Sequence, residues 1–276
     1  MLPSAEQAAS AQRASKIVEK NASFHILERS EKMIGISKGR KMMKKLLFAI
    51  IVVAIFVGCG QQANPTNPRC VEMRTTMGDI VLELSDLTPI HRDNFMQLVE
   101  EHYFDSLLFH RVIENFMIQG GDPRTRDISG KEFFADGPET GNPRYWEDIP
   151  AEISFPELYH KRGALAAARE GDNVNPERRS SRTQFYIVWG RTFSDEQLDA
   201  QQQRITRATE GRVTLPDSIR EVYKRVGGTP HLDGQYTVFG HVVSGLEVVE
   251  RIQLTATDSL DRPVEDVRIL SVKEIK

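Results

Sequence analysis

Eight short runs of apolar and β-branched residues, separated by turn signals, constrain the fold of this chain more than any other feature. The first two alternate in polarity and flank Met77-Gly78-Asp79, a tripeptide typical of a hairpin turn. The last run lies close to the end of the chain, so the pattern extends from Cys70 onward. It contains no internal repeat. We therefore expect strands over residues 71–75, 80–84, 108–113, 116–119, 163–168, 184–188, 237–242 and 267–272.

Two helical patterns accompany these strands. Thr88-Pro89 places a proline in a first helical turn, and an apolar stripe follows it. A second helix is expected from Ser244, with Glu247 completing a capping box. Eight short strands and two helices predict a mainly β fold, a closed eight-stranded antiparallel barrel capped by a helix at each end. Closure would remove the exposed edges of a flat sheet.

Two segments exceed this minimal pattern. Residues 127–150 are rich in Gly, Pro and acidic residues, and we expect a long loop there. Residues 191–230 carry helical signals and form a helical insertion. Ser194 and Gln197 make a capping box, and a stripe ends at Gly227-Gly228. The stripe consists of Ile219, Val222, Tyr223 and Val226. The insertion either packs beside a functional groove or is a surface decoration.

The segment before the expected strands has the order of a bacterial lipoprotein signal. Lysines and methionines over residues 41–45 precede an unbroken apolar run over residues 46–57, and Gly58-Cys59 follows. The run is shorter than the ~20 residues that a spanning helix needs, and its length suits a signal peptide. We expect a signal peptide over residues 42–58 and a lipid on Cys59. An uncleaved membrane anchor with an incidental cysteine is the alternative.

The flanking residues follow from this interpretation. Residues 1–41 lie upstream of the signal, so we expect translation to begin at Met42 or Met43; a genuine cytoplasmic extension is the alternative. Residues 59–69 are polar, contain proline and lack periodicity, as in a flexible linker. The folded domain is then residues 70–276. It would be extracytoplasmic, anchored to the cell envelope by lipid and facing the periplasm.

Composition excludes several classes of protein. A net charge of −3 and a pI of about 6.2 argue against nucleic-acid binding. The two cysteines rule out a disulfide scaffold and a cysteine-rich zinc site. No histidine pair has metal-ligand spacing. We expect no metal, no cofactor and a monomer.

Residues 109–122 place one arginine and one glutamine among apolar side chains on what we expect to be a single β-hairpin. A cation and an amide beside an apolar floor suit a ligand that has both a greasy ring and a polarisable amide, which describes an X-Pro peptide bond. Isomerising such a bond moves no proton, so His110 is expected to be structural. Arg111 is the candidate for donating to the prolyl nitrogen, because its guanidinium is always charged and holds several N–H groups in a fixed plane.

The run over residues 109–122 resembles the signature of the cyclophilin peptidyl-prolyl isomerases, and so do residues 163–169, 181–187 and 231–240. The resemblance covers about residues 70–276 and implies the same barrel. It implies that Arg111 is catalytic. It also implies a substrate-binding set formed by Phe116, Met117, Gln119, Ala168, Arg169, Gln184, Tyr186, His231, Leu232 and Tyr236.

The chain departs from the common family pattern at four of these positions. Arg169 stands where the family often has Asn, Tyr186 where it has Phe, His231 where it has Trp, and Tyr236 where it has His. We expect the hydroxyl of Tyr186 at the rim of the pocket and the charge of Arg169 to affect substrate preference.

The expected function is that of an envelope peptidyl-prolyl cis-trans isomerase that acts on X-Pro bonds without a covalent step and so speeds the folding of envelope or secreted proteins. Its partners would be proline-containing peptides, unfolded proteins and the membrane. The alternative is a non-catalytic peptide-binding or chaperone lipoprotein on the same fold, which the departures at Arg169, His231 and Tyr236 favour.

Overall fold

The computed structural model describes residues 68–126, 143–145 and 147–276. All described residues belong to one compact unit, Thr66–Lys276. Cys59, the expected signal peptide over residues 42–58, the extension over 1–41 and most of the linker over 59–69 lie outside the described residues. So do most residues of the expected loop over 127–150. No helix in the described part of the chain is long and apolar enough to span a bilayer.

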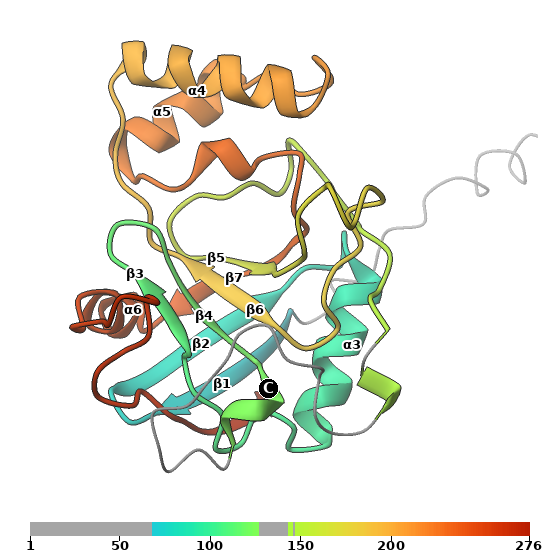
Figure 1. The fold of residues 1–276 in the computed structure, drawn as a ribbon, viewed down its shortest axis with the longest axis vertical. Coiled ribbons are helices and arrows are strands. Elements are labelled where there is room, and N and C mark those ends of the chain that lie inside the picture. The colour runs from blue at the N-terminus through green and yellow to red at the C-terminus, as the bar shows by residue number, and fades with distance from the viewer. Residues whose placement is uncertain (1–67, 127–142, 146) are drawn as a thin grey trace, which may run out of the picture. The chain divides into compact units, whose positions relative to one another are not determined.

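The eight expected strands form one antiparallel sheet, and their boundaries differ from the expected ones by a few residues (Figure 1). Across the sheet their order is β3-β4-β6-β5-β7-β2-β1-β8. The strands are β1 Arg69–Thr75, β2 Gly78–Leu84, β3 Arg111–Ile113, β4 Met117–Gly120, β5 Ala164–Ala167, β6 Phe185–Val188, β7 Val238–Ser244 and β8 Ile269–Ile275.

The prediction of a closed barrel is wrong for the described residues, because β3 and β8 end the sheet without pairing with each other. The segment before β3 bonds to the other edge of the sheet, in place of a pairing between β3 and β8. Its bonds to the other edge include Ser106 N–H to the Ile269 carbonyl at 2.8 Å and Phe109 N–H to the Val267 carbonyl at 2.9 Å. A three-residue β3 is too short to continue the pairing, so the sheet is an open half-barrel whose gap is bridged by an irregular segment.

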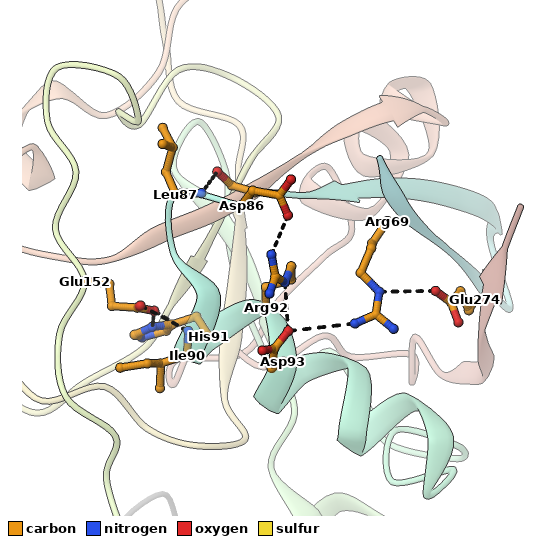
Figure 2. Close-up of polar contacts among 10 residues, drawn as sticks. Arg69, Asp86, Leu87, Ile90, His91, Arg92, Asp93, Glu152 and Glu274 are labelled. Atoms are coloured by element: carbon orange, nitrogen blue, oxygen red, sulfur yellow. Dashed lines mark hydrogen bonds and ion pairs between the residues drawn. The ribbon is translucent and has the colours of Figure 1, made fainter. Parts of the chain in front are cut away.

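Helix α3, Pro89–Glu100, buries Phe95, Leu98 and Val99 against the sheet, as the stripe predicts. Its amino terminus is capped from elsewhere in the chain. The Glu152 carboxylate accepts the backbone N–H groups of Ile90 and His91 at 3.0 and 2.9 Å, and it lies 2.7 Å from His91 Nδ1 (Figure 2). A carboxylate there satisfies free N–H groups and complements the positive end of the helix.

The solvent side of the same helix joins the edge of the sheet through ion pairs. Arg92 pairs with Asp86 and with Asp93, and Arg69 on β1 reaches both Asp93 and Glu274 on β8 (Figure 2). Apart from Arg92, which is partly buried, these groups are exposed, so each pair contributes little to stability. Through Arg69, they link Asp93 on α3 to β1 and to Glu274 on β8.

Helix α6, Leu246–Gln253, begins differently from the prediction. Ser244 is the last residue of β7, and the helix is preceded by Gly245 with a φ of 85° and no side-chain cap. The predicted capping box of Ser244 and Glu247 is therefore wrong. A Cβ at position 245 would lie 2.2 Å from the Asp79 carbonyl oxygen, so this close turn needs glycine.

The insertion folds as two helices, α4 Asp195–Ala208 and α5 Asp217–Arg225, with a small apolar core of their own. The predicted capping box of Ser194 and Gln197 is confirmed. Ile219 and Tyr223 are buried as the stripe predicts, but Val226 lies beyond the helix and is exposed. Helix α4 packs against a short 3-10 helix, η3 Pro230–Leu232, which leads the chain back toward the sheet.

Candidate functional site

Strands β3 and β4 form the hairpin that the sequence predicts, with Arg111 directly opposite Gln119. On the other side of β4, strand β6 places Tyr186 directly opposite Gln119. Residues directly opposite each other on paired strands point to the same face of a sheet. The three side chains therefore lie side by side on one face, although Tyr186 is far from the hairpin in sequence.

This face opens into a cavity of about 180 Å³. All of its lining residues belong to the set expected from sequence: Arg111, Phe116, Met117, Gln119, Ala168, Arg169, Tyr186, Leu232 and Tyr236. Phe116, Met117, Leu232 and Tyr186 give it apolar walls, while Arg111 and Gln119 supply polar groups along one side. The space suits a small ring beside a hydrogen-bonding group.

The other two expected residues, Gln184 and His231, do not line the cavity but contact residues that do. Gln184 accepts from Gln119 Nε2 at 3.0 Å and donates to Asp122 at 3.3 Å, so it holds the Gln119 amide in place. His231 stacks on Phe116 with ring centroids 5.6 Å apart. Burial lowers the pKa of His231 to about 4, so this ring is neutral at neutral pH and supports the Phe116 wall as an aromatic surface.

Arg111 lines the cavity and is half exposed. Its Nε lies 3.4 Å from Asp261 Oδ2, and both side chains are 44% exposed. Its neighbour Gln119 bonds Gln184 and not Arg111. An exposed ion pair of this kind is weak, so it leaves the guanidinium able to turn toward a bound ligand. Asp261 lies in an irregular loop and has no sequence pattern to mark it, so its contact with Arg111 was not predicted.

Arg169 is not a free charge at the mouth of the cavity. Its guanidinium lies 4.2 Å from the centroid of the Tyr236 ring, and Nε donates to the Gln235 carbonyl at 2.9 Å. The same group pairs with Asp172 at 2.7 Å. Arg169 and Tyr236 therefore form one wall fixed by a cation–π contact.

The backbone beside that wall has free groups. Ala168 N–H and carbonyl are already bonded to Gln184 and Ser181. The Arg169 amide and carbonyl make no hydrogen bond within the described part of the chain, so they are available to an extended peptide.

Tyr186 differs from the expectation. Its hydroxyl does not lie at the rim: it is buried and lies 3.0 Å from His160 Nε2. His160 Nδ1 in turn lies 2.9 Å from Asp233 Oδ1. This contact was not predicted, because His160 and Asp233 are far apart in the chain. His160 belongs to no recognisable pattern, and Asp233, although it lies within residues 231–240, has no local signal for a buried contact.

Residues 70–274 match the family model described as cyclophilin type peptidyl-prolyl cis-trans isomerase/CLD. The chain belongs to this family.

Relatives of this cyclophilin include two described as candidate enzymes. A Streptococcus pyogenes protein, described as a candidate bifunctional phosphatase/peptidyl-prolyl cis-trans isomerase, is 35% identical over 213 residues, or 76% of this chain and 39% of that protein. A Staphylococcus haemolyticus protein, described as a candidate peptidyl-prolyl cis-trans isomerase, is 32% identical over 203 residues, or 73% of this chain and 89% of that protein. The chain thus spans well under half of the first and most of the second.

Solved structures support the fold alone at the identities found. A crystal structure of a Cryptosporidium parvum cyclophilin type peptidyl-prolyl cis-trans isomerase aligns with a TM-score of 0.51 and 23% identity, covering 76% of this chain and 98% of that one. A second crystal structure of that protein, in the presence of the dipeptide Ala-Pro, gives 0.50 and 22%, covering 75% and 99%.

His110 in this cyclophilin is buried, in line with the structural role expected from the sequence. Burial lowers its pKa from an ordinary 6.5 to about 4, although the nearby Asp122 carboxylate opposes the shift. The folded protein therefore holds His110 neutral through the range in which the unfolded chain takes up a proton.

Stability should consequently fall on mild acidification. Because the folded pKa of His110 lies below the unfolded value, its contribution is complete above about pH 6.5 and is lost as the pH falls toward 4. At pH 5 we expect the His110 site to lower the free energy of unfolding by about 2 kcal/mol relative to pH 7. Urea unfolding of the wild type and His110→Gln at both pH values measures this. The variant should lose less between the two pH values, whereas His102→Gln, at an exposed histidine, should behave as the wild type. Equal losses for all three proteins would contradict the assignment.

Proposed function

We propose that residues 70–276 catalyse the cis-trans isomerisation of X-Pro peptide bonds. The observation that carries the proposal is the placement of Arg111 and Gln119 opposite each other at the side of a cavity with apolar walls. Family membership and relatives described as candidate isomerases support the same activity. The Ala-Pro dipeptide used with the Cryptosporidium protein suggests the chemical class of the ligand.

The mechanism needs no covalent intermediate. Rotation about a peptide bond faces a barrier of ~18–20 kcal/mol, because the nitrogen shares its lone pair with the carbonyl. In the twisted state the nitrogen regains that lone pair and becomes a hydrogen-bond acceptor. A donor aimed at it binds the twisted state more tightly than either planar isomer and so lowers the barrier.

The residues divide this work between them. Phe116, Met117 and Leu232 would hold the prolyl ring in the apolar part of the cavity, where a low dielectric strengthens polar contacts. Arg111 would donate to the prolyl nitrogen, and Gln119, held by Gln184, would bond the peptide backbone. The free Arg169 amide and carbonyl would pair with the same backbone on the opposite side.

The decisive experiment measures isomerisation of an X-Pro peptide with and without the purified domain. A large acceleration by the wild type supports the enzyme. Saturable binding of the peptide without acceleration would instead support the alternative, a non-catalytic peptide-binding or chaperone protein.

We also propose that the protein works outside the cytoplasm, tethered by a lipid on Cys59 and facing the periplasm, with unfolded envelope or secreted proteins as clients. The proposal rests on the order of basic, apolar and Gly-Cys segments over residues 41–59. Expressed in a bacterial host fed a radiolabelled fatty acid, the wild type should carry label and sediment with membranes. Cys59→Ser should lose both properties, and Cys70→Ser should keep them. Label retained by Cys59→Ser would overturn the anchor.

A further inference from the structure

A buried chain of hydrogen bonds runs from the helical insertion to the wall of the cavity. The Tyr223 hydroxyl on α5 donates to Asp233 Oδ2 at 2.6 Å. His160 Nδ1 and the His160 backbone N–H each lie 2.9 Å from Asp233 Oδ1. Tyr186 on β6 then meets His160 Nε2 at 3.0 Å. All four residues are buried, with at most 5% of any of them exposed.

The direction of each bond follows from the carboxylate at the centre. Asp233 accepts from Tyr223 and from the His160 backbone, and it faces Nδ1, so Nδ1 carries a proton. In the neutral imidazole, Nε2 is then an acceptor and the Tyr186 hydroxyl donates to it. Every polar group in the chain of contacts has a partner, which is the condition under which a buried network rigidifies its surroundings.

The network fixes two separate walls of the cavity. Tyr186 lines the cavity directly, and its ring is held by the bond at its hydroxyl and by stacking on His160 with planes 13° apart. Asp233 immediately follows Leu232, another lining residue, at the end of η3. One carboxylate therefore sets the position of Leu232 through the backbone and of Tyr186 through His160.

Tyr223 ties this arrangement to the insertion and does not line the cavity. A phenylalanine could fill the same apolar volume without bringing a hydroxyl into the interior, where an unsatisfied polar group is costly. The hydroxyl thus has a specific use, which is to hold the second oxygen of Asp233. The insertion reaches the cavity through this contact.

We propose that the helical insertion positions the proline pocket through Tyr223, Asp233, His160 and Tyr186, and that Tyr223 is a positioning residue for substrate binding. This inference rests on the proposed function, since the pocket it acts on is the one assigned to the prolyl ring. It assigns the insertion a role in the site in place of surface decoration. Loosening the network should weaken ligand binding more than the chemical step.

The test is a double-mutant cycle with Tyr223→Phe and Tyr186→Phe, each of which removes one hydroxyl. We expect Tyr223→Phe to raise KM by about three- to tenfold, with kcat changed less than twofold, in keeping with the loss of one buried hydrogen bond. The double variant should be little worse than either single variant, because both hydroxyls act through Asp233 and His160. Rates are measured well below the melting temperature of every variant, so that a loss of stability alone does not change KM.

Tyr159→Phe is the matched control. Tyr159 packs edge-on against Tyr223 with centroids 5.8 Å apart, and its hydroxyl makes no hydrogen bond among the described residues. It should leave KM unchanged. Unchanged KM in Tyr223→Phe, or effects that add fully in the double variant, would overturn the inference.

A second readout separates this inference from the proposed function. Calorimetric titration with an Ala-Pro peptide gives a dissociation constant for the wild type and for each variant of the double-mutant cycle. If the wild type binds the peptide without isomerising it, the activity proposal fails. A coupled rise in Kd for Tyr223→Phe would still support the positioning role, and an unchanged Kd would overturn it.

Discussion

Arg111→Ala is expected to lower kcat/KM for an X-Pro peptide by about 10²- to 10³-fold, the usual loss when one donor to a transition state is removed. The guanidinium would contribute mainly in the twisted state, so the loss should appear in kcat more than in KM. The fold should persist, because Arg111 is half exposed and its ion pair with Asp261 is a weak surface contact. The measurement is a peptide isomerisation assay alongside a thermal melt.

Two further variants sharpen the result. Arg111→Lys keeps the positive charge but loses the planar fork, so it should recover only part of the activity. Arg69→Ala is the matched control, since Arg69 also forms an exposed ion pair, with Glu274 at the β1–β8 edge, and does not line the cavity. It should retain wild-type rates. Equal rates for the wild type and Arg111→Ala would exclude the mechanism and favour a peptide-binding protein.

The expected strands were found because local signals determine them. Alternation over β1 and β2 gives their positions. The tight turn between them sets the register, and it lies at Thr76-Met77, just before the predicted Gly78-Asp79, which are already paired in β2. The residues that line the cavity were identified for a related reason. Arg111, Met117 and Gln119 lie on one hairpin, so their relative placement follows from strand geometry once the turn is known. The family resemblance supplied the partners from β6 and η3.

Features that depend on contacts between distant segments were not predictable. Closure of the sheet required β3 and β8 to pair, and nothing in either segment indicates that the chain before β3 would bridge the gap instead. Ser244 and Glu247 have the spacing of a capping box, but pairing of β7 with β2 keeps Ser244 in the strand. The buried position of the Tyr186 hydroxyl was not predictable, because its partner His160 gives no sequence signal.

Asp233→Ala is expected to lower the free energy of unfolding by about 3–5 kcal/mol, among the largest effects of any single substitution in this domain. The carboxylate is buried and receives the Tyr223 hydroxyl and the His160 backbone N–H, and it also faces His160 Nδ1. Its removal leaves these donors without a partner among buried residues, and each unpaired group then costs its full desolvation penalty. Urea unfolding at neutral pH, followed by tryptophan fluorescence, gives the change.

Two variants distinguish lost hydrogen bonds from lost volume. Asp233→Asn keeps the shape of the side chain but turns an N–H group toward one of the donors. It should lower the free energy of unfolding less than Asp233→Ala does, and more than the same substitution of an exposed aspartate does. Asp258→Ala is the matched control, because Asp258 also accepts two backbone N–H groups, from Leu260 and Arg262, but on an exposed turn. Water replaces it there, so the loss of stability should be small beside that of Asp233→Ala. If Asp233→Ala unfolds within about 1 kcal/mol of the wild type, the buried carboxylate does not organise this part of the fold.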